Sequence, residues 1–514
     1  MPLMLPLLLE RQRNLLKVKL QQQLQVTEGG FKKMSKPSLS FLSEDEIETI
    51  HNASLQVLEN TGVKVMSRKA LDILKEAGAK VDYGKNHATI PRNLVEEALK
   101  RAPKTIKYGA RNPEYDFVLN KKEVHFTTCG APPCIIDWET GERRTSTNED
   151  LARWTRIADY LNNVHVVWPS MTPSDVPAPM QNLTALVTCL KNTEKHVEHE
   201  ALNARDAQYQ IEIAAAIVGG REQLKKRPII SGVQCPISPL TYEKGITEGA
   251  IEYAKAGVPV VVLPMPLAGE TAPATLAGTV VVNNAENLGN LVMLEFASPG
   301  APVLYGSASA IANPRTGAYS PGTPERAIIQ MALAQLAYHY KLPCEISSAN
   351  CDCKVPDVQA GFERTMNLTT AMLMSGIDII IGLGAIDAAN AMSPELLVID
   401  NEIIDGIRRL SRGFEVNDDT LALDVIDKVG PGGIFFGQKH TLEHYKNEFW
   451  LPKISDKDTF ETWRKIGSKT MDKVAREKVR EILATHKPES IPKAVEREIS
   501  QIYKTAKAEF LRKS

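Results

Sequence analysis

The chain has 514 residues, of which 61 are Lys or Arg and 62 are Asp or Glu, so its formal net charge is −1. This balance argues against nucleic acid or an anionic membrane as the partner. Hydrophobic residues make up 43% of the chain but aromatic residues only 6%, which is typical of helices that cover a buried parallel sheet. One (β/α) barrel takes roughly 250 residues or more as a single domain, so a barrel with flanking segments fits this length.

The seven cysteines are odd in number and lack the spacing of a disulfide framework, which indicates a reducing compartment and a cytoplasmic location. The apolar start, MPLMLPLLL, is not typical of a secretory signal, because the positive charges follow it and no small-residue cleavage site comes after it. Met34 is an equally good start. We therefore interpret residues 1–37 as an N-terminal extension that is disordered, forms a short helix, or results from the choice of start.

Residues 38–123 are predicted to form a helical segment with short strands. Ser43 and Glu46 have the spacing of a capping box at the start of a helix over 43–59. Two more helices are predicted at 67–77 and 91–102, and the pattern becomes short and β-like after residue 105. This segment precedes the main repeating part of the chain.

A unit of a short β-branched run, a loop and a helix repeats over residues 124–412. Strands are predicted at 124–127, 164–168, 196–198, 228–231, 258–263, 303–305, 344–347 and 377–381. Helices are predicted at 148–161, 180–191, 204–218, 241–256, 274–296, 324–340, 358–375 and 393–410. Alternation predicts a parallel sheet, and eight strands predict closure into a (β/α)8 TIM barrel. An open doubly wound sheet is the alternative, but the glycine-rich phosphate turn that it needs after its first strand is missing.

Residues 413–514 are predicted to be a helical C-terminal extension that packs on the barrel. Its first part contains a turn-rich stretch, Val429-Gly430-Pro431-Gly432-Gly433, and a charged helical tail begins at residue 456. The charges of the tail recur at helical spacing, which indicates a solvated outer face.

Three aromatic residues fall at predicted strand ends or in the loops that follow them, where barrel enzymes carry their reactive groups: Trp168, Tyr305 and Tyr319. Such rings either pack the mouth of the barrel or form a cage for a cation, because the face of each ring is negative. Residue type alone favours packing. Their place at the active end makes a cage almost as good an interpretation.

Several polar residues of the same loops are candidates for substrate binding. Arg315 is placed to hold a substrate carboxylate through two hydrogen bonds, although a surface arginine is an equally good interpretation. Gln234, Asn350 and Asp352 are further candidates that face the mouth.

Two other groups suggest chemistry but carry less weight. In KHVEHE, the side chains of His196, Glu198 and His199 suggest an acid and a base, yet a strand histidine is more often structural. Cys351 and Cys353 suggest a metal site, but they lack a clear third and fourth ligand. We therefore predict no metal, and the absence of Walker, GxGxxG and GxSxG motifs removes the usual supports for nucleotide-driven and serine-hydrolase chemistry.

Three stretches resemble one family. NDDTLALDVIDKVGPGGIFFGQKHTLEHYKNEFWLPKISD, at 417–456, resembles the C-terminal signature of the trimethylamine methyltransferase superfamily. KVPDVQAGFERTMNLTTAMLMSGIDIIIGLGAID, at 354–387, resembles its last barrel units, and FLSEDEIETIHNASLQVLENTGVKV resembles its N-terminal helices. The likeness covers almost the whole chain from residue 38.

The resemblance implies transfer of a methyl group from a methylated amine to the Co(I) of a separate corrinoid protein. Members specific for trimethylamine carry pyrrolysine, whereas this sequence holds only the twenty standard residues. It therefore resembles the branch that demethylates quaternary amines, with glycine betaine as the first expectation and proline betaine or carnitine as alternatives. The resemblance further implies that no cofactor is bound tightly, because the partner presents the cobalamin, and that the chain forms a homo-oligomer.

The positive charge of a quaternary ammonium already makes the amine a good leaving group, so the protein needs mainly to position the substrate. On this interpretation Trp168, Tyr305 and Tyr319 hold the cation, and Arg315 or loop amides hold a carboxylate. Phe435 joins the cage if the neighbouring glycine-rich turn folds over the mouth. The rival hypotheses are a quaternary-amine binding protein without chemistry and a zinc-dependent methyltransferase that uses the two cysteines of the CDC motif.

Overall fold

The computed structural model describes residues 37–512, so the predicted N-terminal extension lies almost wholly outside the described residues. The chain divides into two compact units. The barrel unit comprises residues 37–411 and 451–514, and the small unit comprises residues 1–36 and 412–450, of which 412–450 are described. Within the described part of the chain, no helix combines the length and the apolar character needed to cross a membrane.

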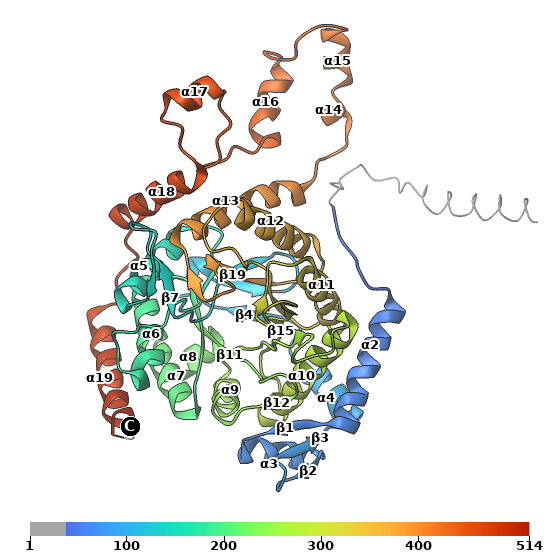
Figure 1. The fold of residues 1–514 in the computed structure, drawn as a ribbon, viewed down its shortest axis with the longest axis vertical. Coiled ribbons are helices and arrows are strands. Elements are labelled where there is room, and N and C mark those ends of the chain that lie inside the picture. Colours follow the sequence, from blue (N-terminus) through green and yellow to red (C-terminus); the bar gives the residue numbers. More distant parts are fainter. Residues whose placement is uncertain (1–36, 513–514) are drawn as a thin grey trace, which may run out of the picture. The chain divides into compact units, whose positions relative to one another are not determined.

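The centre of the barrel unit is a closed barrel of eight parallel strands, which confirms the predicted fold class (Figure 1). In spatial order the strands are β6 (His125–Thr128), β9 (Val166–Val167), β10 (His196–Glu200), β11 (Ile230–Gln234), β13 (Val260–Val262), β15 (Val303–Ser307), β18 (Cys344–Ser347) and β19 (Ile379–Leu383). The barrel closes where Thr127 pairs with Val166 on one side and with Ile381 on the other.

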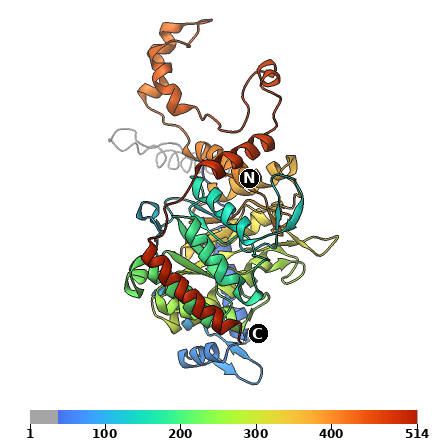
Figure 2. The same cartoon turned by 90° about the vertical axis from the view of Figure 1, so that its left-hand side faces the viewer.

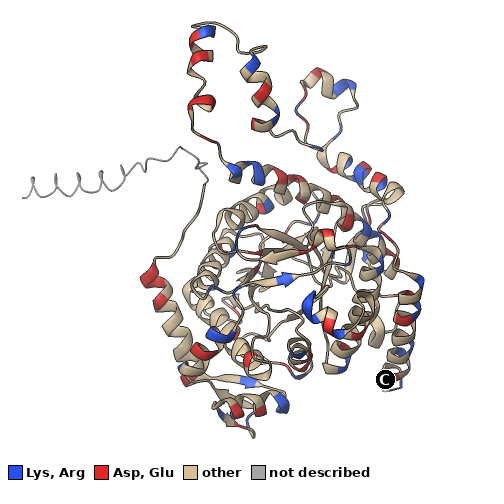
Figure 3. Cartoon of the chain, turned by 180° about the vertical axis from the view of Figure 1, so that it is seen from behind, with Lys and Arg blue, Asp and Glu red and all other residues tan. Residues whose placement is uncertain are grey.

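Helices cover the outside of the barrel in the predicted order. They are α5 (Asn148–Tyr160), α6 (Ala178–Asn192), α7 (Ala204–Val218), α8 (Arg221–Lys226), α9 (Lys244–Ala256), α10 (Leu276–Ala297), α11 (Pro324–His339), α12 (Val358–Leu373) and α13 (Pro394–Arg412). The helix predicted at 241–256 begins only at Lys244, because β12 (Thr241–Tyr242) pairs with β1 (Val63–Val65) of the N-terminal segment. Charges of both signs are interspersed along the outer helices (Figure 3).

The N-terminal segment combines the three predicted helices with a small sheet. α2 (Glu44–Gln56) starts at the predicted capping box, in which the Glu46 amide donates to Ser43 Oγ over 3.3 Å and the Ser43 amide donates to Glu46 Oε2 over 2.8 Å. The others are α3 (Arg68–Ala77) and α4 (Arg92–Arg101). Strands β1, β2 (Lys80–Asp82) and β3 (His87–Thr89) were not predicted individually.

A hairpin fills the N-terminal end of the barrel. It consists of β4 (Ile106–Tyr108) and β5 (Phe117–Leu119). Its side chains Ile106, Tyr108 and Leu119 belong to the same buried apolar cluster as the barrel-lining Val166, Val233, Val261, Leu304 and Ile379. Because this end is packed, a ligand reaches the barrel from the C-terminal end of the strands, here called the mouth.

Two small sheets, built from the loops that follow the strands, surround the mouth. One contains β14 (Leu267–Ala268), β16 (Ala310–Ala312) and β17 (Tyr319–Ser320). The other contains β7 (Cys134–Ile136), β8 (Arg143–Thr145), β20 (Ala385–Ile386) and β21 (Ala391–Met392). These pairings fix loops that the sequence shows only as stretches rich in glycine and proline.

The C-terminal extension has two parts. After the short α17 (Phe460–Lys465), α18 (Met471–Thr485) packs on α5, and α19 (Lys493–Phe510) packs on α6 and α7 (Figure 2). The hydroxyls of Tyr503 and Thr184 lie 2.8 Å apart, and Arg205 forms a 2.9 Å ion pair with Glu509. The other part, residues 412–450, forms the small unit with α14 (Asp418–Leu421), α15 (Leu423–Val429) and α16 (Lys439–Glu448).

Candidate active site

Trp168 follows β9 at one side of the mouth and is held rigidly. Its indole Nε1 donates a 2.9 Å hydrogen bond to Glu200 Oε2 at the end of β10. Its backbone N donates to Thr128 Oγ1 over 2.9 Å, and the same hydroxyl donates to the Trp168 carbonyl over 2.8 Å. An ideal Cβ on Gly130 would lie 2.6 Å from the Cε2 and Cζ2 atoms of this indole. A glycine is therefore needed where the loop after β6 crosses the ring.

Two thiols lie near Glu200 at the mouth. Cys235 follows β11, and burial raises the pKa of its thiol to about 12. The negative charge of Glu200 contributes to the raised pKa of Cys235 and also to that of Cys129, whose pKa burial raises to about 12. Both thiols are therefore neutral near pH 7.

A buried arginine lies behind the opposite side of the mouth. Arg326, near the start of α11, is fully buried and donates to Ser347 Oγ over 2.6 Å and to the Pro321 carbonyl over 3.2 Å. Among the described residues its Nε has no hydrogen-bond partner, and no carboxylate forms an ion pair with it. Burial raises the pKa of the neighbouring Tyr319, whereas the charge of Arg326 opposes that rise. This guanidinium is thus a buried positive charge without a direct ion pair in the described part of the chain, and Asp352 is the nearby carboxylate that favours its charge.

Two predicted polar residues lie beside Tyr319. Asp352 accepts hydrogen bonds from Ser320 Oγ over 2.9 Å and from the Gly322 amide over 2.8 Å, which ties the loop after β18 to β17. Asn350 is buried, and its Oδ1 has no partner in the described part of the chain. This oxygen lies over the backbone at position 382, where the φ of +116° and the close approach both require glycine.

A pocket of about 1090 Å³ opens at this side of the mouth. Its lining consists of Met265, Asn313, Thr316, Ala318, Tyr319, Ser320, Gly322, Thr323, Asp352, Lys354, Gln359, Glu363, Asp387, Ala388, Ala389 and Asn390. Three of these side chains are acidic and one is basic. Asp387 forms 3.2 Å ion pairs with both Lys354 and Arg143. Excess negative charge beside an aromatic ring suits a cationic ligand.

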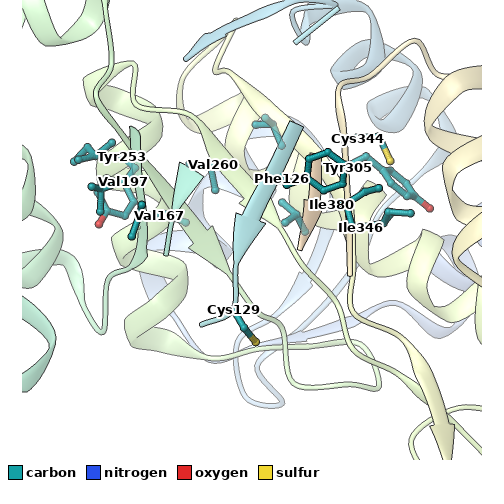
Figure 4. Close-up of a cluster of buried hydrophobic side chains, with 14 of the residues drawn as sticks. Phe126, Cys129, Val167, Val197, Tyr253, Val260, Tyr305, Cys344, Ile346 and Ile380 are labelled. Atoms are coloured by element: carbon teal, nitrogen blue, oxygen red, sulfur yellow. The ribbon is translucent and has the colours of Figure 1, made fainter. Parts of the chain in front are cut away.

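The structure places Tyr305 outside the barrel. Its hydroxyl donates a 3.0 Å hydrogen bond to Asn284 Oδ1 on α10, and its ring belongs to a buried cluster with Ile346, Ile380 and Cys344 (Figure 4). The reason is strand alternation, since the preceding Leu304 belongs to the apolar cluster inside the barrel. Tyr305 is therefore not brought together with the residues of the mouth.

The other predicted substrate-binding residues are spread more widely. Arg315 is exposed at the turn between β16 and β17, where its backbone N donates to Asn313 Oδ1 over 2.9 Å. Gln234 is buried at the end of β11, and its Oε1 has no partner among the described residues. Phe435 belongs to the small unit, so its place in a cage stays a prediction.

The three candidates of the KHVEHE stretch, His196, Glu198 and His199, do not line the pocket at the mouth. His196 and Glu198 point into the barrel, where Ser231 Oγ lies 3.0 Å from both His196 Nε2 and Glu198 Oε2. Burial lowers the pKa of His196 to about 3, raises that of Glu198 to about 7 and raises that of the nearby Glu345 well above its usual value. His196, Glu198 and Ser231 thus form a polar layer of the barrel core. His199 points outward, with Nε2 2.9 Å from the Asn182 carbonyl.

Cys351 and Cys353 are buried near the mouth, with their Sγ atoms 2.8 Å apart. The contact between the two thiols lowers the pKa of Cys351 and raises that of Cys353. The nearby Arg364 forms a fully buried 2.7 Å ion pair with Asp400. Among the described residues, no third His, Cys, Asp or Glu joins the two thiols in a cluster of metal-ligand geometry.

Sequence reasoning missed four residues of this region: Glu200, Met265, Arg326 and Glu363. Glu200 was detectable, because it lies two positions beyond Glu198 and so shares its face of the strand. Arg326 and Glu363 lie on helices, and only the fold brings them to the mouth.

A closed (β/α)8 barrel with a large pocket at its mouth, lined by Tyr319 and three acidic side chains, defines a barrel enzyme that acts on a small molecule. Residues 11–510 match the family described as Trimethylamine methyltransferase (MTTB), and the chain belongs to this family. The protein is a methyltransferase.

Three relatives illustrate the similarity. Trimethylamine methyltransferase MttB of Desulfitobacterium hafniense is 35% identical over 486 residues, which are 94% of this chain and 97% of that protein. Glycine betaine methyltransferase of another strain of that species is 33% identical over 457 residues, 88% of this chain and 94% of that one. Trimethylamine methyltransferase MttB of Methanosarcina barkeri is 33% identical over 489 residues, which are 94% of this chain and 98% of that protein. The crystal structure of monomethylamine methyltransferase MtmB from Methanosarcina barkeri aligns with a TM-score of 0.46 at 13% identity, covering 91% of this chain and 92% of that one.

Proposed function

We propose that this methyltransferase moves a methyl group from a quaternary amine, first of all glycine betaine, to the Co(I) of a separate corrinoid protein. One observation carries the proposal: the pocket at the mouth offers the ring of Tyr319 and three carboxylates, which suit a cation. The name of one relative, glycine betaine methyltransferase, supports the same substrate. Proline betaine, carnitine and other methylated amines are the alternatives within the same reaction.

The cation is proposed to lie between Trp168 and Tyr319. The indole is fixed by its bond to Glu200, and Tyr319 lines the acidic pocket together with Asp352 and Glu363. A quaternary ammonium donates no hydrogen bond, so it needs ring faces and negative charge at a distance. Tyr305 is left out of the proposed cage because its side chain packs against α10.

A betaine also carries a carboxylate, and Arg326 explains how the mouth would favour it. This buried guanidinium forms no direct ion pair within the described residues and lies behind Tyr319 and Asn350. A buried cation that is compensated only at a distance, here by Asp352, attracts an anion because the protein interior screens charge weakly. Arg315, exposed on its turn, remains the second candidate for the carboxylate.

The proposed reaction needs no covalent intermediate on the protein. The C–N bond of the ammonium breaks, its electron pair stays on nitrogen as the lone pair of a tertiary amine, and the methyl group bonds to cobalt, which is oxidised from Co(I) to Co(III). Cys129 and Cys235 are poor competitors as nucleophiles, because burial raises the pKa of both thiols to about 12. The protein contributes positioning and the exclusion of water.

The size of the pocket favours an enzyme over the rival hypothesis of a binding protein. A volume of about 1090 Å³ exceeds what one small amine fills, and Met265 in the lining is 43% exposed. The excess space suits the approach of a second reactant. The corrinoid is then a substrate presented by the partner, in the cytoplasm, and the chain is proposed to act as a homo-oligomer.

The test is anaerobic incubation of the enzyme with chemically reduced cob(I)alamin or a corrinoid protein and a panel of amines. Loss of the Co(I) absorption is expected with glycine betaine and not with trimethylamine. Trp168→Ala and Tyr319→Ala are expected to slow the loss, whereas Tyr338→Ala removes an exposed tyrosine of α11 and serves as the matched control. Binding of glycine betaine without any loss of Co(I) would instead support the binding protein.

The double variant Cys351→Ser/Cys353→Ser tests the rival hypothesis of a zinc-dependent methyltransferase. Loss of both a bound metal and methyl transfer in this variant would replace the proposed mechanism with metal activation of the acceptor or the amine. If the variant still transfers the methyl group, the result supports a mechanism based on positioning without a metal.

A further inference from the structure

The small unit, residues 412–450, contains three side chains that are typical metal ligands. Asp419 lies on α14, and His440 and His444 lie four residues apart on one face of α16. One ligand atom from each of the three lies within 4.8 Å of the others. It is the one such cluster of His, Cys, Asp or Glu within the described residues.

The distances suit a shared ion. His444 Nε2 lies 3.1 Å from Asp419 Oδ2, and His440 Nε2 lies 3.9 Å from Asp419 Oδ1. Ligand atoms about 2.1 Å from a tetrahedral zinc are about 3.4 Å apart. The two distances end on different oxygens of Asp419 and lie on either side of that value, so a small side-chain adjustment brings one oxygen to both imidazoles. His440 Nε2 also lies 2.8 Å from the Asp419 carbonyl oxygen, so metal binding would shift the ring proton to Nδ1.

The helices around the cluster lack a buried core, so a bound ion would stabilise them. Helices α14, α15 and α16 contain 4, 7 and 10 residues, and none of their residues is buried. Short helices without a core are not stable by themselves, and small metal-binding domains supply the missing stability through a bound ion. Apolar side chains of the unit are instead exposed, such as Leu423, Phe436 and Leu442.

We propose that Asp419, His440 and His444 bind one Zn²⁺ that joins α14 to α16. Two imidazoles and one carboxylate are ligands that zinc prefers over magnesium or calcium. With three protein ligands, the fourth position of the tetrahedron takes water. The ion stabilises the fold of the small unit and takes no part in the methyl transfer proposed above, so the two proposals can fail separately.

The test uses the full chain. Protein stripped with a chelator is titrated with zinc chloride in a calorimeter, and zinc content is measured after dialysis. The wild type is expected to bind one equivalent, and His440→Gln, His444→Gln and Asp419→Asn are expected to lose it. Glu443→Gln is the matched control, because this exposed side chain lies on the same helix outside the cluster. Cys351→Ser/Cys353→Ser is expected to keep the zinc.

A second readout reports on structure and does not depend on activity. Zinc is expected to slow proteolytic cleavage within residues 412–450 in the wild type and in Glu443→Gln, but not in His444→Gln. The proposal is overturned if the wild type takes up no zinc, if uptake persists in both histidine variants, or if it disappears only in the cysteine variant.

Discussion

Gly130→Ala tests the placement of Trp168 without touching a candidate binding side chain. The added Cβ would lie 2.6 Å from two carbons of the indole and 3.1 Å from a third, whereas carbon atoms in contact are normally about 3.5–4.0 Å apart. The ring must therefore retreat by about 1 Å. That displacement disturbs the hydrogen bond from Trp168 Nε1 to Glu200, which measures 2.9 Å here.

Gly130→Ala is expected to lower both the stability of the protein and its affinity for glycine betaine. Overpacking costs about 1–3 kcal/mol of unfolding free energy, and urea denaturation measures it. A displaced ring also loses up to the whole of a cation–π contact worth about 0.5–2 kcal/mol, so the Kd for glycine betaine is expected to rise in calorimetry, by at most roughly 30-fold.

Gly361→Ala is the control, because its Cβ would meet no atom within 4 Å inside α12. That variant is expected to raise stability by up to about 1 kcal/mol and to leave binding unchanged. Equal stability and equal affinity in Gly130→Ala and the wild type would refute the placement of the indole against this loop.

The remaining predictions concern one ring and two buried carboxylates. Tyr319→Ala is expected to weaken glycine betaine binding by about 0.5–2 kcal/mol, whereas Tyr319→Phe, which keeps the ring, stays close to the wild type in the same titration. Burial raises the pKa of Glu286 from 4.5 to about 7, so the native state binds more protons than the unfolded chain in this range, and wild-type stability falls as pH rises from 4.5 through 7, by about 3 kcal/mol. Other buried carboxylates with raised pKa values, such as Glu198 and Glu295, add to the fall. Urea unfolding at pH 5 and pH 8 should therefore show a fall that is smaller in Glu286→Gln than in the wild type by about 2–3 kcal/mol; an equal fall in both would refute the assignment. Asp400→Asn leaves the buried Arg364 without its 2.7 Å partner and is expected to cost about 3–5 kcal/mol in denaturation, so an unchanged midpoint would contradict the pair.

The sequence predicted the elements whose signals are local. The capping box of Ser43 and Glu46 marked the start of α2, and the helix predicted at 393–410 is α13. β12 was missed because its residues continue a helical pattern, and only pairing with β1, far away in the sequence, makes them a strand.

The candidate site was harder to predict because it depends on side-chain direction. Tyr305 ends a buried run, but strand alternation turns its ring outward to Asn284, and a strict alternation from Leu304 would have shown this. Arg326 has the sequence context of an ordinary helix arginine. Its burial beside Ser347 depends on how α11 packs on β18.

Glycine betaine with three deuterated methyl groups tests the central claim most directly. The enzyme is mixed anaerobically with cob(I)alamin or a corrinoid protein, and both products are analysed by mass spectrometry. We predict one trideuteromethyl group on cobalt for each dimethylglycine that keeps the other two. Unlabelled cobalt with intact glycine betaine, while the amine is bound, would contradict methyl transfer and support a binding protein.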